Sequence, residues 1–104
     1  MIRERIELWR ERKRRRQRIG CLVDTFYNIS FRRPLWKGDD NRYKWISNGL
    51  DYAARDNIIS REERDALKAY AMLRIFKRVD SELVLKADSS IVRRLMNEVG
   101  FTYS

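Results

Sequence analysis

Residues 10–18, RERKRRRQR, contain seven basic side chains, one glutamate, one glutamine and no apolar residue. Nine residues without an apolar side chain have nothing to bury in a hydrophobic core, whatever secondary structure they adopt. They lie near the start of a chain of 104 residues, a length that fits one small domain. The sequence therefore predicts a basic arm that lies outside a single core.

The sequence on both sides of this basic segment has a helical pattern. Apolar residues recur on one helical face before it, and the same face becomes apolar again after it. We therefore expect a helix over residues 2 to about 28, about 40 Å long at 1.5 Å per residue, either straight or bent at Gly20. The alternation in residues 25–31, TFYNISF, would also suit a strand. The residues on this face are Ile2, Ile6, Trp9, Lys13, Arg16, Gly20, Val23 and Tyr27.

A loop and a second helix are expected next. Pro34 and Gly38 break regular structure within residues 32–41, RRPLWKGDDN. Asp40 or Asn41 can cap the following helix, which should end near Asp56 or Asn57. Its apolar positions are Trp45, Ile46, Leu50, Ala53 and Ala54.

The last third of the chain predicts two more helices. Ser60 and Glu63 have the spacing of a capping box, and this helix carries Leu67, Tyr70, Ala71, Leu73, Phe76 and Val79. Residues 81–87 fit a helix, a short strand or a loop. Asp88 or Ser89 should cap a final helix that ends at Gly100 and carries Ile91, Val92, Leu95, Met96 and Val99.

These patterns give an all-α fold class: a small domain of about four helices with a long basic N-terminal helix. We divide it into an Arg-rich helical arm, residues 1–18, and a small helical domain, residues 19–104. Burial is expected for Leu67, Phe76 and Leu95, where three helices should meet.

The charge of the chain is concentrated in the arm. Residues 1–18 hold nine basic and three acidic side chains, whereas the other 86 residues carry a net charge of only +3. Such asymmetry indicates a polyanionic partner. We expect two candidate ridges of basic side chains, with Lys13 between them. One ridge is Arg10, Arg14 and Arg18, and the other is Arg12, Arg15 and Arg16.

A second, weaker basic patch lies in the expected loop, where aromatic side chains alternate with cations and could stack on bases. Trp45 should be a core anchor, whereas Trp36 could be exposed. The candidate binding residues in this patch are Arg32, Arg33, Trp36 and Lys37.

Enzymatic function is not expected from this sequence. The chain has no histidine, and no serine or cysteine has a neighbouring base at an activating spacing. We therefore expect no catalytic residue, no metal site and no cofactor. Cys21 is the one cysteine, so no internal disulfide can form, and a reducing cytoplasm is the simplest location. No apolar run reaches the ~18 residues of a membrane span, and no signal-peptide pattern follows the N-terminus.

Residues 43–75, YKWISNGLDYAARDNIISREERDALKAYAMLRI, resemble a pattern in small orphan proteins of tailed bacteriophages: an aromatic-Ile helix, alanines, and Ile-Ser-x-Glu-Glu opening the next helix. The arm is also similar to the Arg-rich RNA-binding arms of phage antitermination proteins. These resemblances imply a phage-encoded accessory protein that acts on host machinery in the bacterial cytoplasm. Such proteins include polymerase modulators and anti-CRISPR inhibitors.

The sequence leaves three functions open. The first is a nucleic-acid-binding protein whose arm neutralises the phosphates of RNA or DNA. The alternative is a protein-protein inhibitor or modulator whose basic helix binds an acidic surface of a host nucleoprotein complex. A membrane-surface helix through Ile2, Ile6 and Trp9 ranks third because its apolar face is only three residues long.

Overall fold

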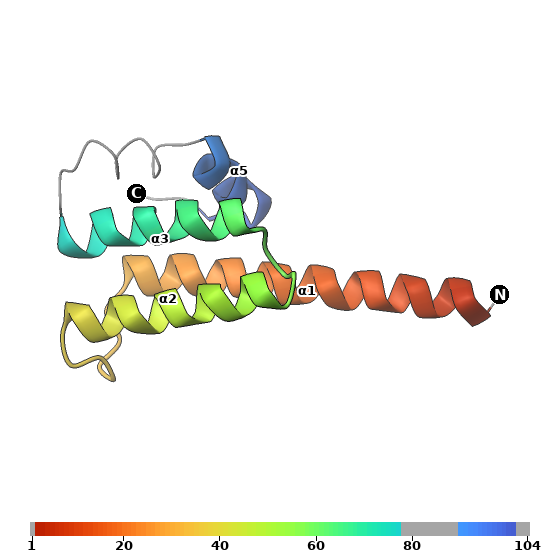
Figure 1. Cartoon of the computed structure of the whole chain (residues 1–104), viewed down its shortest axis with the longest axis horizontal. Coiled ribbons are helices and arrows are strands. Elements are labelled where there is room, and N and C mark those ends of the chain that lie inside the picture. Colours follow the sequence, from red (N-terminus) through yellow and green to blue (C-terminus); the bar gives the residue numbers. More distant parts are fainter. Residues whose placement is uncertain (1, 78–89, 102–104) are drawn as a thin grey trace.

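Four α-helices make up most of the part of the chain that the computed structural model describes, residues 2–77 and 90–101. They are α1 (Ile2–Ser30), α2 (Asp39–Arg55), α3 (Arg61–Phe76) and α5 (Ser90–Glu98), and these described residues contain no strand. Figure 1 shows α2 and α3 packed along one half of α1, with α5 across the start of α3. The other half of α1 projects away from them. The expected all-α fold is confirmed.

Helix α1 runs without interruption from Ile2 to Ser30 and passes through Gly20 as helix. The strand alternative for residues 25–31 is therefore wrong up to Ser30. The buried positions at this end are Leu22, Thr25, Phe26, Asn28 and Ile29, which lie on one side of a helix and do not alternate as in a strand.

The core takes side chains from every described helix. Leu22, Phe26, Leu50, Leu67 and Leu95 are fully buried, so the expectation for Leu67 and Leu95 is confirmed. Phe26 is at the centre of the aromatic contacts. Its ring stacks on Phe101 at 5.5 Å between centroids and meets the edge of the Tyr70 ring at 6.2 Å.

Phe76, also expected in the core, is only half-buried. Its ring packs beside that of Tyr43, with 5.8 Å between centroids. It lies at the last residue of α3, so it covers the edge of the core instead of its centre.

The start of α2 differs from the expectation. Gly38 is the N-cap, with φ of 102° and no side-chain cap, so Asp40 and Asn41 already lie inside the helix. Glycine adopts this positive φ without steric cost, which lets the helix begin earlier than the capping side chains suggest. Asp39 and Asp40 then occupy the first turn, where carboxylates favour the helix dipole.

Trp45 is 62% exposed, so the prediction of a core anchor is wrong. The buried positions of α2 are Arg42, Ile46, Leu50 and Ala53. Trp45 lies one residue, or about 100° of helix rotation, from Ile46, and this rotation turns it towards solvent.

The connection from α2 to α3 is short, as expected. Helix α2 is followed by Asp56 as C-cap, and Asn57 adopts a left-handed φ of 59°. The capping box is confirmed: Glu63 N donates to Ser60 Oγ at 3.0 Å, and Ser60 N donates to Glu63 Oε1 at 2.8 Å.

The final helix is confirmed over the residues that are described. Val92 and Leu95 are buried, and Gly100 follows with φ of 65°, as expected for a residue that ends a helix. The predictions for Val79, for residues 81–87 and for a cap at residue 88 or 89 lie outside the described residues.

Candidate nucleic-acid interface

The free half of α1, residues 2–17, has no buried side chain. All of these residues are exposed, and Arg18 is the first side chain of the helix that is partly covered. Figure 1 shows this half projecting beyond the body, by which we mean residues 18–30 of α1 together with α2, α3 and α5. The expected candidates on the exposed surface of the free half are Arg10, Arg12, Lys13, Arg14, Arg15 and Arg16.

The positive charges of the free half are not balanced by contacts within the described chain. None of the basic side chains from Arg3 to Arg16 takes part in an ion pair or a side-chain hydrogen bond there. Lys13 lies over the Trp9 ring, with its Nζ 5.2 Å from the centroid. Like charges one turn apart disfavour a helix by a few tenths of a kcal/mol per pair, so a polyanion would relieve this repulsion.

The acidic side chains of the free half gather on one side of the helix. Glu4, Glu7 and Glu11 continue, at helical spacing, the inner face that includes Leu22 and Ile29 in the body half. The inner face is therefore acidic where nothing covers it and apolar where the body covers it. The opposite side, which faces away from the body, carries basic side chains and no glutamate in the free half, whereas Arg14 and Arg15 flank the inner face.

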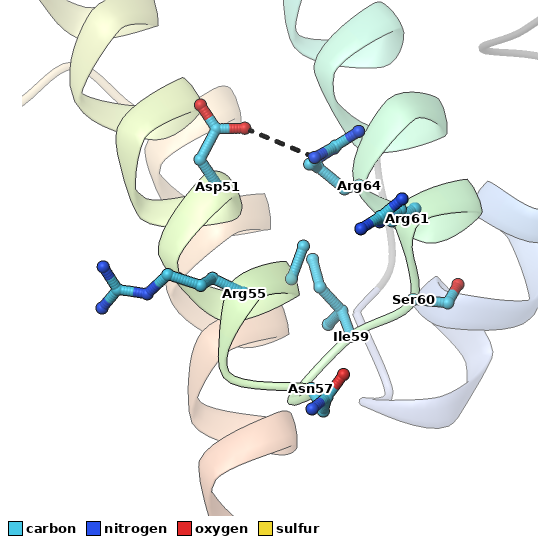
Figure 2. Close-up of a pocket in the computed structure, with 8 residues that line it drawn as sticks. Asp51, Arg55, Asn57, Ile59, Ser60, Arg61 and Arg64 are labelled. Carbon is cyan, nitrogen blue, oxygen red and sulfur yellow. Dashed lines mark ion pairs between the residues drawn. The ribbon is translucent and has the colours of Figure 1, made fainter.

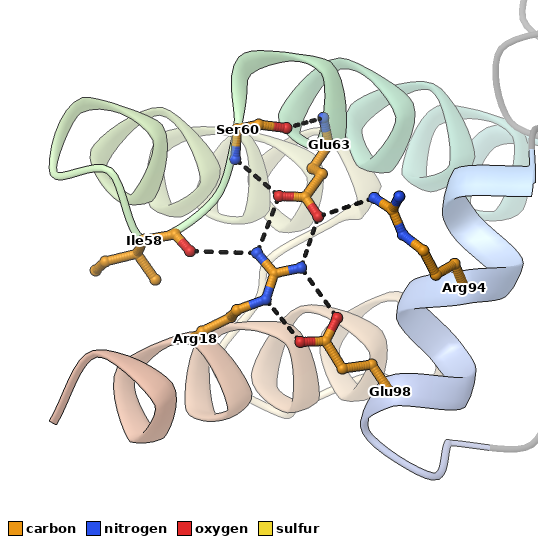
Figure 3. A network of polar contacts seen from close by, with 6 residues as sticks. All are labelled: Arg18, Ile58, Ser60, Glu63, Arg94 and Glu98. Atoms are coloured by element: carbon orange, nitrogen blue, oxygen red, sulfur yellow. Dashed lines mark hydrogen bonds and ion pairs between the residues drawn. The ribbon is translucent and has the colours of Figure 1, made fainter. Parts of the chain in front are cut away.

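A polar network fixes α1 at the point where the free half begins. Figure 3 shows the Arg18 guanidinium between two carboxylates. It donates to Glu63 at 2.9 and 2.6 Å and to Glu98 at 2.7 and 2.9 Å. Arg94 adds a contact to Glu63 at 3.3 Å, and the Ile58 carbonyl accepts from Arg18 at 3.4 Å. Helix α1 is thus tied to α3 and α5 by one side chain.

The electrostatics of this network keep it ionised. The hydrogen bonds from Arg18, helped by the Ser60 backbone and opposed by burial, lower the pKa of Glu63 to about 2. Hydrogen bonds from Arg18 also lower the pKa of Glu98, and the two carboxylates raise the pKa of Arg18. All three groups therefore remain charged in the neutral pH range.

Arg18, expected among the binding residues, thus has an internal role. Residues at i, i+4 and i+8 rotate by about 40° per step around a helix. The ridge from Arg10 through Arg14 consequently turns towards the body and reaches Glu63 and Glu98 at Arg18. We therefore leave Arg18 out of the candidate interface.

The second candidate patch lies in the loop after α1. Arg32 pairs with Asp39 at 2.9 Å, and Arg33 pairs with Asp24 at 3.2 Å. Trp36 is half-buried, whereas Lys37 is exposed. This patch adjoins the C-terminal end of α1, and the body half of the helix separates it from the free half. The structure therefore places the two sets of predicted residues at opposite ends of α1, the first on its free half and the second in the loop that follows Ser30.

Arg42, next to this patch, is a structural residue that sequence reasoning missed. Its side chain is buried, its Nε donates to the Asn28 carbonyl at 2.7 Å, and a second nitrogen donates to the Ile29 carbonyl. These carbonyls lie in the last turn of α1, where no intrahelical donor is available. The helical spacing could have identified it, because Arg42 precedes Ile46 and Leu50 at intervals of four residues and therefore lies on the same buried face of α2.

A polar pocket of about 460 Å³ lies at the turn between α2 and α3 (Figure 2). Asp51, on its wall, already pairs with Lys68 at 2.6 Å and Arg64 at 3.9 Å. The Ser60 hydroxyl is occupied as a helix cap. None of the residues lining this pocket pairs a nucleophile with a base.

The described residues show neither a metal site nor a membrane-spanning helix. No group of three or more histidine, cysteine, aspartate or glutamate side chains there could hold a metal ion. No helix among them combines the length and the apolar character that crossing a bilayer requires. Cys21 is half-buried, and burial raises the pKa of its thiol.

Comparisons with known proteins give no match to a protein family, to a curated protein or to a solved structure.

Proposed function

We propose that this chain is a phage-type nucleic-acid-binding accessory protein that acts in the bacterial cytoplasm and uses the free half of α1 to bind phosphates of RNA or DNA. One observation carries the proposal. Sixteen consecutive residues, 2–17, project from the body as an exposed helix, and none of their basic side chains is paired within the described chain. The phage origin rests on the sequence resemblance over residues 43–75.

Phosphates suit this helix because their oxygens accept hydrogen bonds from guanidinium groups in many orientations. Binding them requires neither a pocket nor a fixed pattern of bases. Binding would also release condensed counterions, which supplies most of the affinity of non-specific complexes.

The salt dependence of binding tests the proposal. The logarithm of the association constant should fall linearly with the logarithm of salt concentration, by about 0.7 to 0.9 per phosphate contact. The double variant Arg12→Gln/Arg16→Gln should bind more weakly and with a shallower slope. A slope that indicates fewer than about three contacts, or no binding at low salt, would contradict the proposal.

A matched control removes the same charge from the body. Lys44 and Arg61 are exposed and lie on α2 and α3. The double variant Lys44→Gln/Arg61→Gln should retain the slope of the unaltered protein. If both double variants lose the same affinity, attraction comes from net charge and the free half has no special role.

A second candidate function is inhibition or modulation of a host nucleic-acid machine, such as an anti-CRISPR protein or a polymerase modulator provides. Ile2 and Ile6 favour it, because they are 77% and 44% exposed at the tip of the free half and phosphate binding does not need them. In that case the basic helix would contact an acidic protein surface. Fixed carboxylates there should discriminate against Arg12→Lys/Arg16→Lys by about 1 kcal/mol per engaged arginine.

A further inference from the structure

The side of α1 that faces away from the body carries an unbroken row of exposed residues, which we call the outer face. Its members recur at alternating intervals of four and three residues along the whole helix, and every one is exposed: Ile2, Ile6, Trp9, Lys13, Arg16, Gly20, Val23 and Tyr27. This spacing is that of a coiled-coil seam. The face is therefore long enough, and regular enough, to hold an extended partner.

The charged residues at the centre of the outer face make a helical partner unfavourable. A two-helix seam would bury Lys13 and Arg16 at positions where coiled coils place apolar side chains. Burying two unpaired cations costs several kcal/mol each. A second copy of this chain would bring further positive charge to the same seam. An elongated polyanion fits the centre better.

Exposed aromatic rings with cations beside them lie at two positions of the outer face, Trp9 in the free half and Tyr27 in the body half. At the first, Lys13 lies 5.2 Å from the Trp9 ring centroid, and Trp9 is 58% exposed. At the second, Arg33 lies 5.2 Å from the Tyr27 centroid and 5.9 Å from that of Trp36. The pair of Arg33 with Asp24 is exposed, and such pairs contribute little in water, so Arg33 can exchange the carboxylate for a phosphate.

Helix α1 holds these two aromatic sites at a fixed separation. Trp9 and Tyr27 are eighteen residues apart in one uninterrupted helix, which corresponds to about 27 Å. Between them the outer face presents the cations Lys13 and Arg16, followed by Gly20 and Val23, while the three glutamates of the free half lie on the inner face. Stacking platforms joined by a positively charged track are what proteins use to bind single strands.

We propose that the outer face of α1 binds single-stranded nucleic acid, with bases stacked on Trp9 and Tyr27 and with phosphates at Lys13, Arg16 and Arg33. This inference rests on the proposed function and narrows it to unpaired strands. Stacking on these rings requires bases whose faces are open. A duplex conceals those faces and would leave both aromatic sites unused.

The test compares affinities by fluorescence anisotropy at one salt concentration. The probes are a single strand of about 16 nucleotides, its duplex, a single strand of about 4 nucleotides and inorganic polyphosphate, with lengths that bracket common single-strand site sizes. The 16-nucleotide single strand should bind at least 10-fold more tightly than the other three. Trp9→Ala and Tyr27→Ala should each weaken it by roughly 5- to 150-fold, the range that corresponds to loss of one stacked base.

The matched control is Tyr52→Ala. Tyr52 is 59% exposed on α2, and Arg55 lies 4.6 Å from its ring centroid, so the same aromatic-cation pair is present away from the outer face. Its variant should bind as tightly as the unaltered protein. All three rings are exposed, so circular dichroism should show unchanged helix content in each variant.

Equal affinity for single strand and duplex, equal affinity for polyphosphate, or an equal loss with Tyr52→Ala would each overturn this inference while phosphate binding by the free half stands. Absence of binding to every nucleic-acid probe at low salt would overturn both proposals. A loss specific to Trp9→Ala and Tyr27→Ala would support the outer face as a single-strand site.

Discussion

The two halves of α1 have different surroundings, although they form one uninterrupted helix. In the body half, Leu22 and Phe26 are fully buried and Arg18 is held by two carboxylates. In the free half, residues 2–17 are all exposed. The same secondary structure therefore contributes to folding at one end and presents a charged surface at the other.

This difference explains how a segment with so many like charges can remain helical. Starting a helix is costly, whereas adding a turn to an existing helix is not. The body half supplies the helical nucleus because its apolar side chains are buried, and the network at Arg18 fixes its direction. The free half extends from that nucleus. Its sequence is therefore free of the requirement to pack in a core and can suit a binding partner.

The largest expected effect on stability is in the body half. Phe26→Ala removes a fully buried ring that contacts Phe101 and Tyr70 and should lower the free energy of unfolding by about 4 kcal/mol. Denaturant unfolding measures it, and Val23→Ala on the exposed side of the same helix is the control. A loss below about 1 kcal/mol would mean that α1 does not pack as described.

The second-largest effect on stability is expected for the polar network around Arg18, at the boundary between the two halves of α1. Glu63→Gln removes the carboxylate that Arg18 and Arg94 share, and the loss of these partly buried, charge-assisted hydrogen bonds should destabilise the fold by about 2 kcal/mol. Glu62→Gln changes the exposed neighbouring residue in the same way and should be almost neutral. Similar losses in both variants would assign the effect to the start of α3 and not to the network.

Low pH should weaken the contact between Glu63 and Arg18. The folded-state pKa of Glu63 is about 2, below the ~4.3 of an unfolded chain. Its stabilisation is therefore complete above pH ~4.3 and is lost as the pH falls towards 2, which amounts to about 2 kcal/mol between pH 5 and pH 3. Unfolding titrations of the unaltered protein and of Glu63→Gln should converge over this interval. Parallel curves would contradict the assignment.

The smallest effect on stability is expected in the free half. Arg12→Gln/Arg16→Gln removes two unpaired charges from an exposed helix and should change the free energy of unfolding by no more than about 0.5 kcal/mol. Its sign should be stabilising, because like-charge repulsion falls. A loss of more than about 1 kcal/mol would show that these side chains support the fold, contrary to the contrast between the two halves.

The sequence predicted the helices well because helical spacing and caps are local signals. The Ser60–Glu63 box and the end at Gly100 could be found from a few neighbouring residues. The exposure of Trp45 could not be predicted, because it depends on which side of α2 faces the other helices. The N-cap at Gly38 could not be predicted either, because its positive φ depends on the tertiary structure.

The candidate interface was only partly predictable for the same reason. A run of basic residues identifies an exposed segment, and the free half confirms that exposure. The sequence did not separate Arg18 from its neighbours, because Glu63 and Glu98 are distant in the chain. The alignment of Trp9 with Tyr27 likewise requires one helix through Gly20, where the sequence allowed a bend.

Amide chemical shifts recorded by NMR, with and without a single strand of about 16 nucleotides, test most directly whether the free half of α1 is the binding surface. We expect the largest changes in residues 2–17, smaller changes at Tyr27 and Arg33, and almost none in the buried turns of α3 and α5 around Leu67 and Leu95. Changes centred on α3 or α5, or no change at low salt, would contradict the division of α1 into an anchored half and a binding half.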